Sequence, residues 1–347
     1  MYYISDSSSL NCYTRTMIIE ARAYARAAIV GNPSDGYNGK TISLIVKNFG
    51  AHILLYQTPE LVIEPQPQDI NQFKNIYQLQ DQINLTGYHG GAPLLKAAIK
   101  KFVEYCQHEK IKLENKNFTI RYNSSIPRQI GLAGSSAIVI ATLRGLMQFY
   151  RVQIPQEILP NLALAVETEE LGINAGLQDR VIQTYEGCVY MNFDKQIIAE
   201  KKHGLYEPLD PDLLPNLYIA YKTELGKVSG KVLNDIKTRY DKGDPHVIDT
   251  LNRIASLADA GKKALLERDY TTLHQLMNEN FDQRCQIMKI SDSNMELVNT
   301  ARQCGASATF TGSGGSVIGI YQNDDMLNKL VAEMRKVNAR VIKPTIV

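Results

Sequence analysis

The sequence predicts an α+β protein built from two domains. Strand-like segments with alternating or β-branched apolar residues fill the region up to residue 63, amphipathic helices follow from residue 94, and both kinds recur up to residue 321. A length of 347 residues allows about two hydrophobic cores at roughly 150 residues per domain. The turn-rich stretch 205–215 is the best candidate for a linker. We therefore expect an N-terminal domain over residues 1–205 and a C-terminal domain over 206–347.

Composition excludes several classes of protein. The formal net charge of +2 provides no broad basic surface, so nucleic acid is not an expected partner. Five scattered cysteines without a CxxC spacing argue against a disulfide framework or a zinc site. The N-terminus lacks a signal-peptide pattern, and no apolar run approaches the ~20 residues of a membrane span. We therefore expect a cytoplasmic protein without a membrane partner.

The first part of the chain predicts a β-rich opening. We expect residues 1–16, which contain three successive serines, to form a loose lead-in. The turn-forming cluster Gly31–Gly36 interrupts the apolar segments and is the kind of rigidly anchored turn that carries binding residues. The expected strands are residues 17–22, 25–30, 41–46, 52–56 and 61–63.

The rest of the chain alternates helices and strands. Helical spacing of apolar residues predicts a helix over 94–107, and residues 118–122 form the strand before a glycine-rich loop. Because the run 138–143 is largely apolar, we expect a buried helix from Ser135 to about Tyr150. The other expected elements are a helix over 155–171, a loop over 174–180, strands over 188–193 and 217–221, two or three helices over 230–286, and a strand, glycine turn and strand over 307–321.

The glycine-rich loop Pro127–Ala137 predicts an anion-binding site. The first four N–H groups of a helix lack partners and its N-terminus carries about half a positive charge, so glycines that bring the backbone close can seat a phosphate there. Ser135 and Ser136 stand where a hydroxyl could cap the helix or hold a magnesium ion beside bound phosphates. An N-capped core helix without a ligand accounts for this loop, taken alone, equally well.

Familiar nucleotide-binding patterns are absent. The segment Gly39–Thr41 lacks the first glycine of a GxxxxGK[ST] loop, since Ser34 occupies that position. Gly312 and Gly314 begin a GxGxxG pattern that Val317 breaks at its third glycine. The HExxH pattern of zinc metalloproteases does not occur either. A phosphate site in this chain must therefore be of another type.

Three segments, in this order, resemble the three motifs of the GHMP small-molecule kinases: Arg26–Asp35, Pro127–Ala137 and Thr311–Gly315. These segments are most similar to the glucuronokinase group of that family, and the string Ala175–Val181 matches it as well. The glycine loop is one residue longer, and the turn after Thr311 one residue shorter, than the general family pattern. Both departures resemble variants of the glucuronokinase group.

The resemblance implies a GHMP-kinase-like fold with an N-terminal ribosomal-S5-like α/β domain and a C-terminal ferredoxin-like α+β domain. It also implies that Asp179 is the catalytic base and Arg26 its basic partner, and that Mg²⁺ is held by Glu167 with Ser135 or Ser136. The residues that would contact ATP are Pro127, Gly131, Leu132, Ala133, Gly134, Ser135, Ser136, Ala137, Thr311, Gly312, Ser313 and Gly314.

The substrate implied by the resemblance is a small-molecule sugar acid, with D-glucuronate first, phosphorylated by ATP at its anomeric hydroxyl. Asp35 and Gly315 are expected on the substrate side. The carboxylate of a uronic acid suits the two-pronged donor of an arginine better than a lysine. The candidates are Arg22, Arg128 and Arg180. We expect a monomer or a homodimer.

The sequence is also compatible with different functions. Another member of the GHMP family would use the same loop, either a kinase for galacturonate, a neutral sugar or a mevalonate-type acid, or a diphosphomevalonate-type decarboxylase. A non-catalytic sugar or nucleotide sensor would keep the same fold. Without its context, Asp179 is a solvated turn residue and Glu167 a charge on a helix surface. Arg26 within an apolar strand is harder to interpret in this way, because a buried guanidinium needs a partner. The presence of both Asp179 and Arg26 favours catalysis over sensing.

A shared nucleotide site requires the glycine loop before Ser135 to meet the turn Thr311–Ser316, far away in sequence. We predict that the helix at Ser135 is buried and that the two glycine segments lie within about 15 Å, a bound set by the reach of a few extended residues. A larger separation in the structure would exclude one triphosphate bridging both segments.

Overall fold

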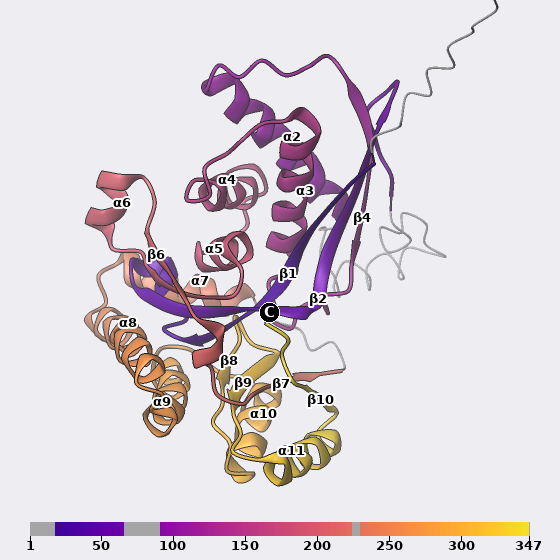
Figure 1. Ribbon diagram of the computed structural model, residues 1–347. Coiled ribbons are helices and arrows are strands. Elements are labelled where there is room, and N and C mark those ends of the chain that lie inside the picture. The colour runs from indigo at the N-terminus through magenta and orange to yellow at the C-terminus, as the bar shows by residue number, and fades with distance from the viewer. Residues whose placement is uncertain (1–17, 66–90, 224–229, 347) are drawn as a thin grey trace, which may run out of the picture.

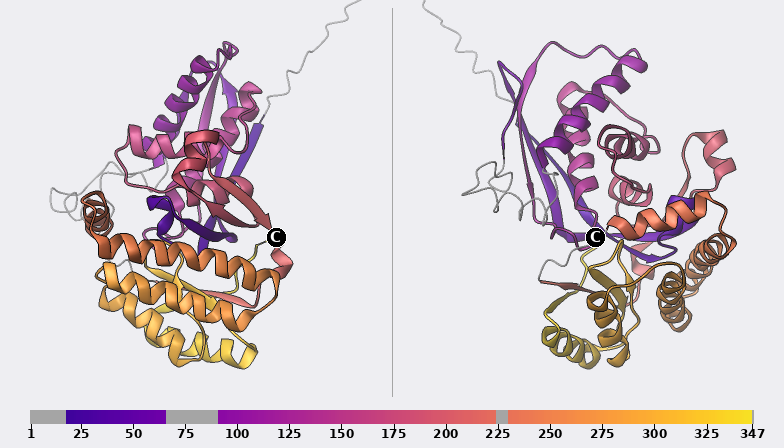
Figure 2. Two further views of the ribbon diagram at one scale, coloured as in Figure 1. Left: turned by 90° about the vertical axis from the view of Figure 1, so that its left-hand side faces the viewer. Right: turned by 180° about the vertical axis from the view of Figure 1, so that it is seen from behind.

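The computed structural model of the protein describes residues 18–65, 91–223 and 230–346, and only the backbone of residues 230–235. The lead-in expected over residues 1–16 lies outside these ranges. Two β-sheets are covered by helices, which confirms the α+β expectation (Figures 1 and 2). None of the described helices is long and apolar enough to cross a membrane.

The first sheet is organised around one long strand, β2 (Lys40–Thr58), which pairs with three others. The strands β1 (Ile18–Val30), β4 (Asn117–Ser124) and β5 (Cys188–Asn192) all run antiparallel to it. Two short strands extend the sheet, and its order is β3-β4-β2-β5-β6 with β1 beside β2. These are β3 (Val62–Ile63), parallel to β4, and β6 (Leu205–Leu209), antiparallel to β5.

The first four strands expected from the sequence merge in pairs into two long strands in the structure. β1 spans both apolar segments before the Gly31 turn, and β2 spans both segments after it. The register between them jumps from the pair Tyr24–Gly50 to the pair Ala25–Val46. The interruption at residues 47–49 is therefore a bulge, which disturbs the alternation of apolar residues without ending the strand.

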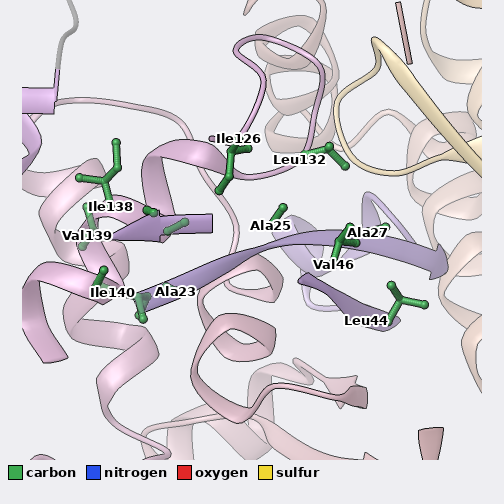
Figure 3. Close-up of a cluster of buried hydrophobic side chains, with 14 of the residues drawn as sticks. Ala23, Ala25, Ala27, Leu44, Val46, Ile126, Leu132, Ile138, Val139 and Ile140 are labelled. Atoms are coloured by element: carbon green, nitrogen blue, oxygen red, sulfur yellow. The ribbon is translucent and has the colours of Figure 1, made fainter. Parts of the chain in front are cut away.

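Four helices lie on one face of this sheet (Figure 1). They are α2 (Gly91–His108), α3 (Gly134–Tyr150), α4 (Leu159–Ala165) and α5 (Gln178–Tyr185). Figure 3 shows Ala23, Ala25 and Ala27 of β1 in the same apolar cluster as Ile138 and Val139 of α3. These small strand residues leave room for the larger side chains of the helix, so α3 is buried as predicted.

The second sheet has a ferredoxin-like topology, as expected. Its four strands form an antiparallel sheet in the order β10-β7-β9-β8, which is 4-1-3-2 when they are numbered along the chain. They are β7 (Leu217–Lys222), β8 (Thr309–Phe310), β9 (Ser316–Ile320) and β10 (Ala339–Ile342). The helices α10 (Asp292–Gln303) and α11 (Asp324–Lys336) lie beside this sheet, and the sequence analysis predicted neither of them (Figure 1).

Three helices occupy the stretch in which two or three were expected: α7 (Gly230–Asp241), α8 (Pro245–Leu266) and α9 (Tyr270–Ile287). α8 packs against the first sheet, where a Cβ added to Gly261 would lie 2.8 Å from the side chain of Val30. α9 runs beside α8 in all views (Figures 1 and 2). Its inner face thus reaches the junction between the two sheets.

The expected linker contains a strand of the first sheet. After α6 (Lys195–Lys201), β6 pairs with β5 over Leu205–Leu209, and the second sheet begins at Leu217. Leu217 and Ile219 also belong to the same buried apolar cluster as the alanines of β1. The domain division at 205/206 stays a prediction, and the pairing of β6 favours a later division, between Leu209 and Leu217.

The burial of α3 yields a prediction for stability. Leu143 of α3 is 0% exposed, so Leu143→Ala leaves a cavity and should lower the free energy of unfolding by about 2–5 kcal/mol. Leu266, at the end of α8, is 55% exposed, and Leu266→Ala should change the same quantity by no more than about 0.5 kcal/mol. Urea unfolding of the parent and both variants measures this. Equal losses would contradict the assignment of α3 to the core.

Candidate active site

The guanidinium of Arg26 connects three segments that are far apart in the sequence. Arg26 is 5% exposed near the end of β1, and its Nε donates to Asp179 Oδ1 at 2.6 Å. Its Nη1 donates to the carbonyl oxygen of Gly131 at 2.9 Å and to that of Thr311. The backbone N–H of Ala28, two residues on, also donates to Thr311 O at 2.8 Å. One side chain therefore joins the glycine loop, the C-terminal glycine turn and α5.

The two glycine segments touch, which confirms their predicted proximity. Thr311 Oγ1 donates to Gly131 O at 3.2 Å, and Ser316 Oγ donates to Ile130 O at 2.5 Å. Gly131 has a φ of 71°, and a Cβ there would lie 2.7 Å from Gly314 O. Only glycine combines this backbone angle with such a close approach.

The start of α3 differs from the expected cap. The helix begins at Gly134, after Ala133 in the left-handed region, and no side chain caps it. Ser136 Oγ instead donates to Ala133 O at 3.1 Å, and Ser135 Oγ donates to Glu167 Oε1 at 2.7 Å. The capping interpretation of both serines was therefore wrong. A helix start without a side-chain cap keeps its backbone donors available to an anion.

Asp179 lies in the first turn of α5, whereas the sequence analysis expected it in a loop over 174–180. Its two oxygens face two cations, Arg26 on Oδ1 and Arg180 Nη1 on Oδ2 at 3.5 Å. The side chain is 19% exposed, so it remains partly open to solvent. A carboxylate held between two guanidinium groups, with one open side, can accept a proton from a bound hydroxyl.

Glu167 sits on a π-helical turn, Val166–Glu170, where the expected helix over 155–171 changes its hydrogen bonding. The side chain is buried, and its Oε2 accepts from Arg180. Its Oε1 and Ser135 Oγ form a pair of oxygens that suits Mg²⁺, a cation usually bound by one or two carboxylates together with phosphates and water. No cluster of three acidic, histidine or cysteine side chains that could hold a metal ion occurs in the described parts of the chain.

Asp35 lies on the short helix Ser34–Tyr37, after the Gly31 turn. Its Oδ1 accepts from Gln178 Nε2 at 3.0 Å, and the carboxylate packs directly on Gly176, where a Cβ would clash with it. Burial, followed by the negative charge of Asp179, raises the pKa of Asp35 to about 7, although Arg26 lowers it. Asp35 and Asp179 thus form a pair of neighbouring carboxyl groups in different environments.

The three arginines expected to bind a carboxylate occupy different places. Arg180 is buried, and its Nη1 also donates to Gly176 O at 2.7 Å, so a substrate would have to displace Glu167 to reach it. The side chain of Arg22 is 54% exposed and pairs with Glu20. Arg128 is exposed on the glycine loop. The structure therefore brings Arg180 into the site, leaves Arg22 on the surface, and keeps Arg128 at the loop.

Three residues of the C-terminal helices also support the site, and the sequence analysis missed them. Asn280 Oδ1 accepts from Gly31 N at 2.6 Å, and Asn294 Oδ1 accepts from Gly315 N at 2.9 Å. Arg284 Nη1 donates to Gly312 O at 2.9 Å. Asn280 and Arg284 interrupt the apolar stripe of α9, and polar residues on such a stripe were the available signal.

Comparisons with known proteins agree with this geometry. Residues 93–187 match the model of the GHMP kinases N-terminal domain, and residues 262–340 match that of the GHMP kinases C-terminal domain. The chain is 44% identical to Glucuronokinase 1 of Arabidopsis thaliana over 87% of this chain and 85% of that protein. The chain belongs to the GHMP kinases, in the glucuronokinase group.

Other relatives of this GHMP kinase agree. Probable glucuronokinase 2 of Arabidopsis thaliana is 42% identical over 94% of this chain and 91% of that protein. The solved structure of a Lin0012 protein from Listeria innocua has a TM-score of 0.76 at 15% identity and covers 95% of this chain and 98% of its own, so it shows the shared fold. The resemblance to the glucuronokinase group and the two-domain fold that it implied are thus confirmed. As a kinase, the protein is a phosphotransferase with an alcohol group as acceptor.

Asp35 provides a prediction for pH dependence. Its pKa is about 7 in the folded GHMP kinase against an ordinary 3.8, so the folded state binds the proton more tightly than the unfolded state. Asp35 therefore costs stability increasingly as the pH rises from about 4 to about 7. We predict that Asp35→Asn, which cannot ionise, gains stability relative to the parent between about pH 5 and pH 8. Urea unfolding of both proteins at the two pH values measures this, and a difference independent of pH would contradict it.

Proposed function

We propose that this GHMP kinase phosphorylates D-glucuronate at its anomeric hydroxyl with ATP, giving D-glucuronate 1-phosphate and ADP. The observation that carries the proposal is the ion pair between Arg26 Nε and Asp179 Oδ1 at 2.6 Å, held where both glycine segments meet. The identity of 44% with Glucuronokinase 1 supports the choice of acceptor. A cytoplasmic location and a monomeric or homodimeric state belong to the same proposal, and cell fractionation and light scattering test them.

In the proposed reaction the anomeric oxygen attacks the γ-phosphorus of ATP, the bond to the bridging oxygen of ADP breaks, and the hydroxyl proton passes to Asp179. Phosphoryl transfer needs alignment and charge neutralisation more than covalent participation by the protein. Arg26 keeps Asp179 oriented and places a fixed cation beside the transferring group. An anomeric hydroxyl is more acidic than an ordinary alcohol, so a carboxylate is a sufficient base.

The glycine loop and the Thr311 turn are the proposed seat of ATP. The backbone donors at the start of α3 suit its phosphates, and the close contact between Gly131 and Gly314 holds the two segments in register. Ser135 and Glu167 would hold Mg²⁺, which supplies positive charge to the β- and γ-phosphate oxygens when bound. Ser136 fits this role less well, because its hydroxyl is buried and donates to Ala133 O.

The first experiment tests the substrate. We expect Mg-ATP and a panel of D-glucuronate, galacturonate, glucose, galactose and mevalonate to give the highest kcat/KM for glucuronate, with the 1-phosphate as product by phosphorus NMR. Equal efficiency on glucose and glucuronate would overturn the uronic-acid assignment and leave the kinase assignment intact. Nucleotide binding without turnover of any acceptor would favour a sensor.

The second experiment tests the base. Asp179→Asn keeps the shape of the side chain but removes the proton acceptor, so kcat should fall by about 10²–10⁴-fold while the KM for ATP stays close to that of the parent. Asp324→Asn on the exposed start of α11 is the matched control and should leave kcat unchanged. Parent-like turnover of Asp179→Asn would show that positioning alone carries the reaction.

A further inference from the structure

Arg284 is a fully buried cation at the junction of the two sheets. It extends from α9, one turn after Asn280, and is 0% exposed. Its Nη1 donates to Asn32 Oδ1 at 2.5 Å and to Gly312 O at 2.9 Å, while Asn280 Nδ2 donates to Asn32 O at 2.9 Å. Two polar residues of α9 thus hold the turn that leads to Asp35.

Half of this guanidinium forms no hydrogen bond, although the group lies over the ring of Phe310, 5.0 Å from the ring centroid. The Nε and Nη2 groups of Arg284 are buried and form no hydrogen bond, and within the described ranges no carboxylate lies at ion-pair distance from it. Arg26 and Arg180, the other buried arginines, both have a carboxylate partner. A buried cation that lacks one is costly, because desolvation is not offset by an opposite charge.

The charges nearby do not resolve this imbalance. Burial, and then the positive charge of Arg26, lower the pKa of Arg284 to about 10, although the charge of Asp35 raises it, so the group is still cationic at neutral pH. Both guanidinium groups contact the same residue: a Cβ added to Gly312 would lie 2.5 Å from Arg26 Nη1, and Gly312 O accepts from Arg284. The two guanidinium groups therefore favour the binding of an additional anion, besides the carboxylates that the protein itself supplies.

The position of Arg284 indicates which anion. The uncapped start of α3 already offers backbone donors to phosphates, whereas Arg284 is bonded to Asn32, three residues before Asp35, on the expected substrate side. The Nε and Nη2 groups of an arginine form one fork that matches the two oxygens of a carboxylate. Since this edge is covered in the structure, a carboxylate would reach it after a small displacement of the side chain or of the Asn32 turn.

We propose that Arg284 binds the carboxylate of the sugar-acid substrate and thereby selects a uronic acid over a neutral sugar. This inference rests on the proposed function. It replaces Arg22 and Arg180 as the expected carboxylate ligands and leaves Arg128 as the competing candidate.

The test compares Arg284→Met with the parent on glucuronate and on glucose. Loss of the charge-assisted pair should raise the KM for glucuronate about 10- to 100-fold more than the KM for ATP, and should lower kcat/KM for glucuronate by the same factor relative to kcat/KM for glucose. Arg284→Lys keeps the charge but loses the two-pronged geometry, so its KM for glucuronate should lie between those of the parent and Arg284→Met. Arg302→Met is the matched control, since Arg302 stacks on Phe281 and pairs with Asp282 outside the site, and its substrate ratio should equal that of the parent.

A second variant keeps the arginine in place. Asn32→Asp has nearly the same shape and gives Arg284 an internal counter-charge, so glucuronate should bind more weakly although the melting temperature is not lowered. The rise in melting temperature that glucuronate alone produces measures its binding without turnover. This measurement on Asn32→Asp tests the proposal even if Arg284→Met does not fold.

Several outcomes overturn the proposal. Equal losses on glucuronate and glucose in the Arg284 variants, or a KM for ATP raised as much as the KM for glucuronate, would make Arg284 a structural or phosphate-side residue. A selective loss of glucuronate in Arg128→Met, with Arg284→Lys like the parent, would assign the carboxylate to the glycine loop. A parent protein that prefers glucose would refute the proposed function itself and this inference with it.

Discussion

The buried guanidinium of Arg26 is the constraint on which the rest of the site depends. It lies in a strand whose neighbours are mostly alanines and aliphatic residues, where an unpaired cation would be strongly destabilising. Its acceptors are Asp179 of α5, the carbonyl of Gly131 and the carbonyl of Thr311, from three separate segments. Satisfying this one charge therefore requires both sheets and the glycine loop to be in place together.

The glycines make this assembly sterically feasible. Gly131, at a φ of 71°, lies against Ser313 and Gly314, and a Cβ on Gly315 would lie 2.8 Å from Ile130. The two departures from the general motif pattern, a loop one residue longer and a turn one residue shorter, meet at this same contact. Side chains of α9 and α10 then hold the turns from the C-terminal side, through Asn280 on Gly31 and Asn294 on Gly315.

The acidic groups of the site differ in their partners, which gives them different chemistry. Asp179 has a guanidinium on each oxygen, and Glu167 is bound by Arg180 and Ser135. Asp35 has the amide groups of Gln178 as its hydrogen-bond donors, and burial raises its pKa to about 7. Carboxyl groups with such different partners are suited to different tasks within one small region.

The sequence by itself determined the fold class, the glycine loop, the buried helix after it and the family, because these depend on local periodicity and on contiguous motifs. It also identified Arg26 and Asp179 as a pair. Only the tertiary structure decided that β1 and β2 are continuous through a bulge, that Ser135 faces Glu167 instead of capping α3, and that Arg284 enters the site. These features depend on which groups, distant in the sequence, form hydrogen bonds or ion pairs with a buried charge or hydroxyl. The local periodicity of apolar residues does not identify such partners.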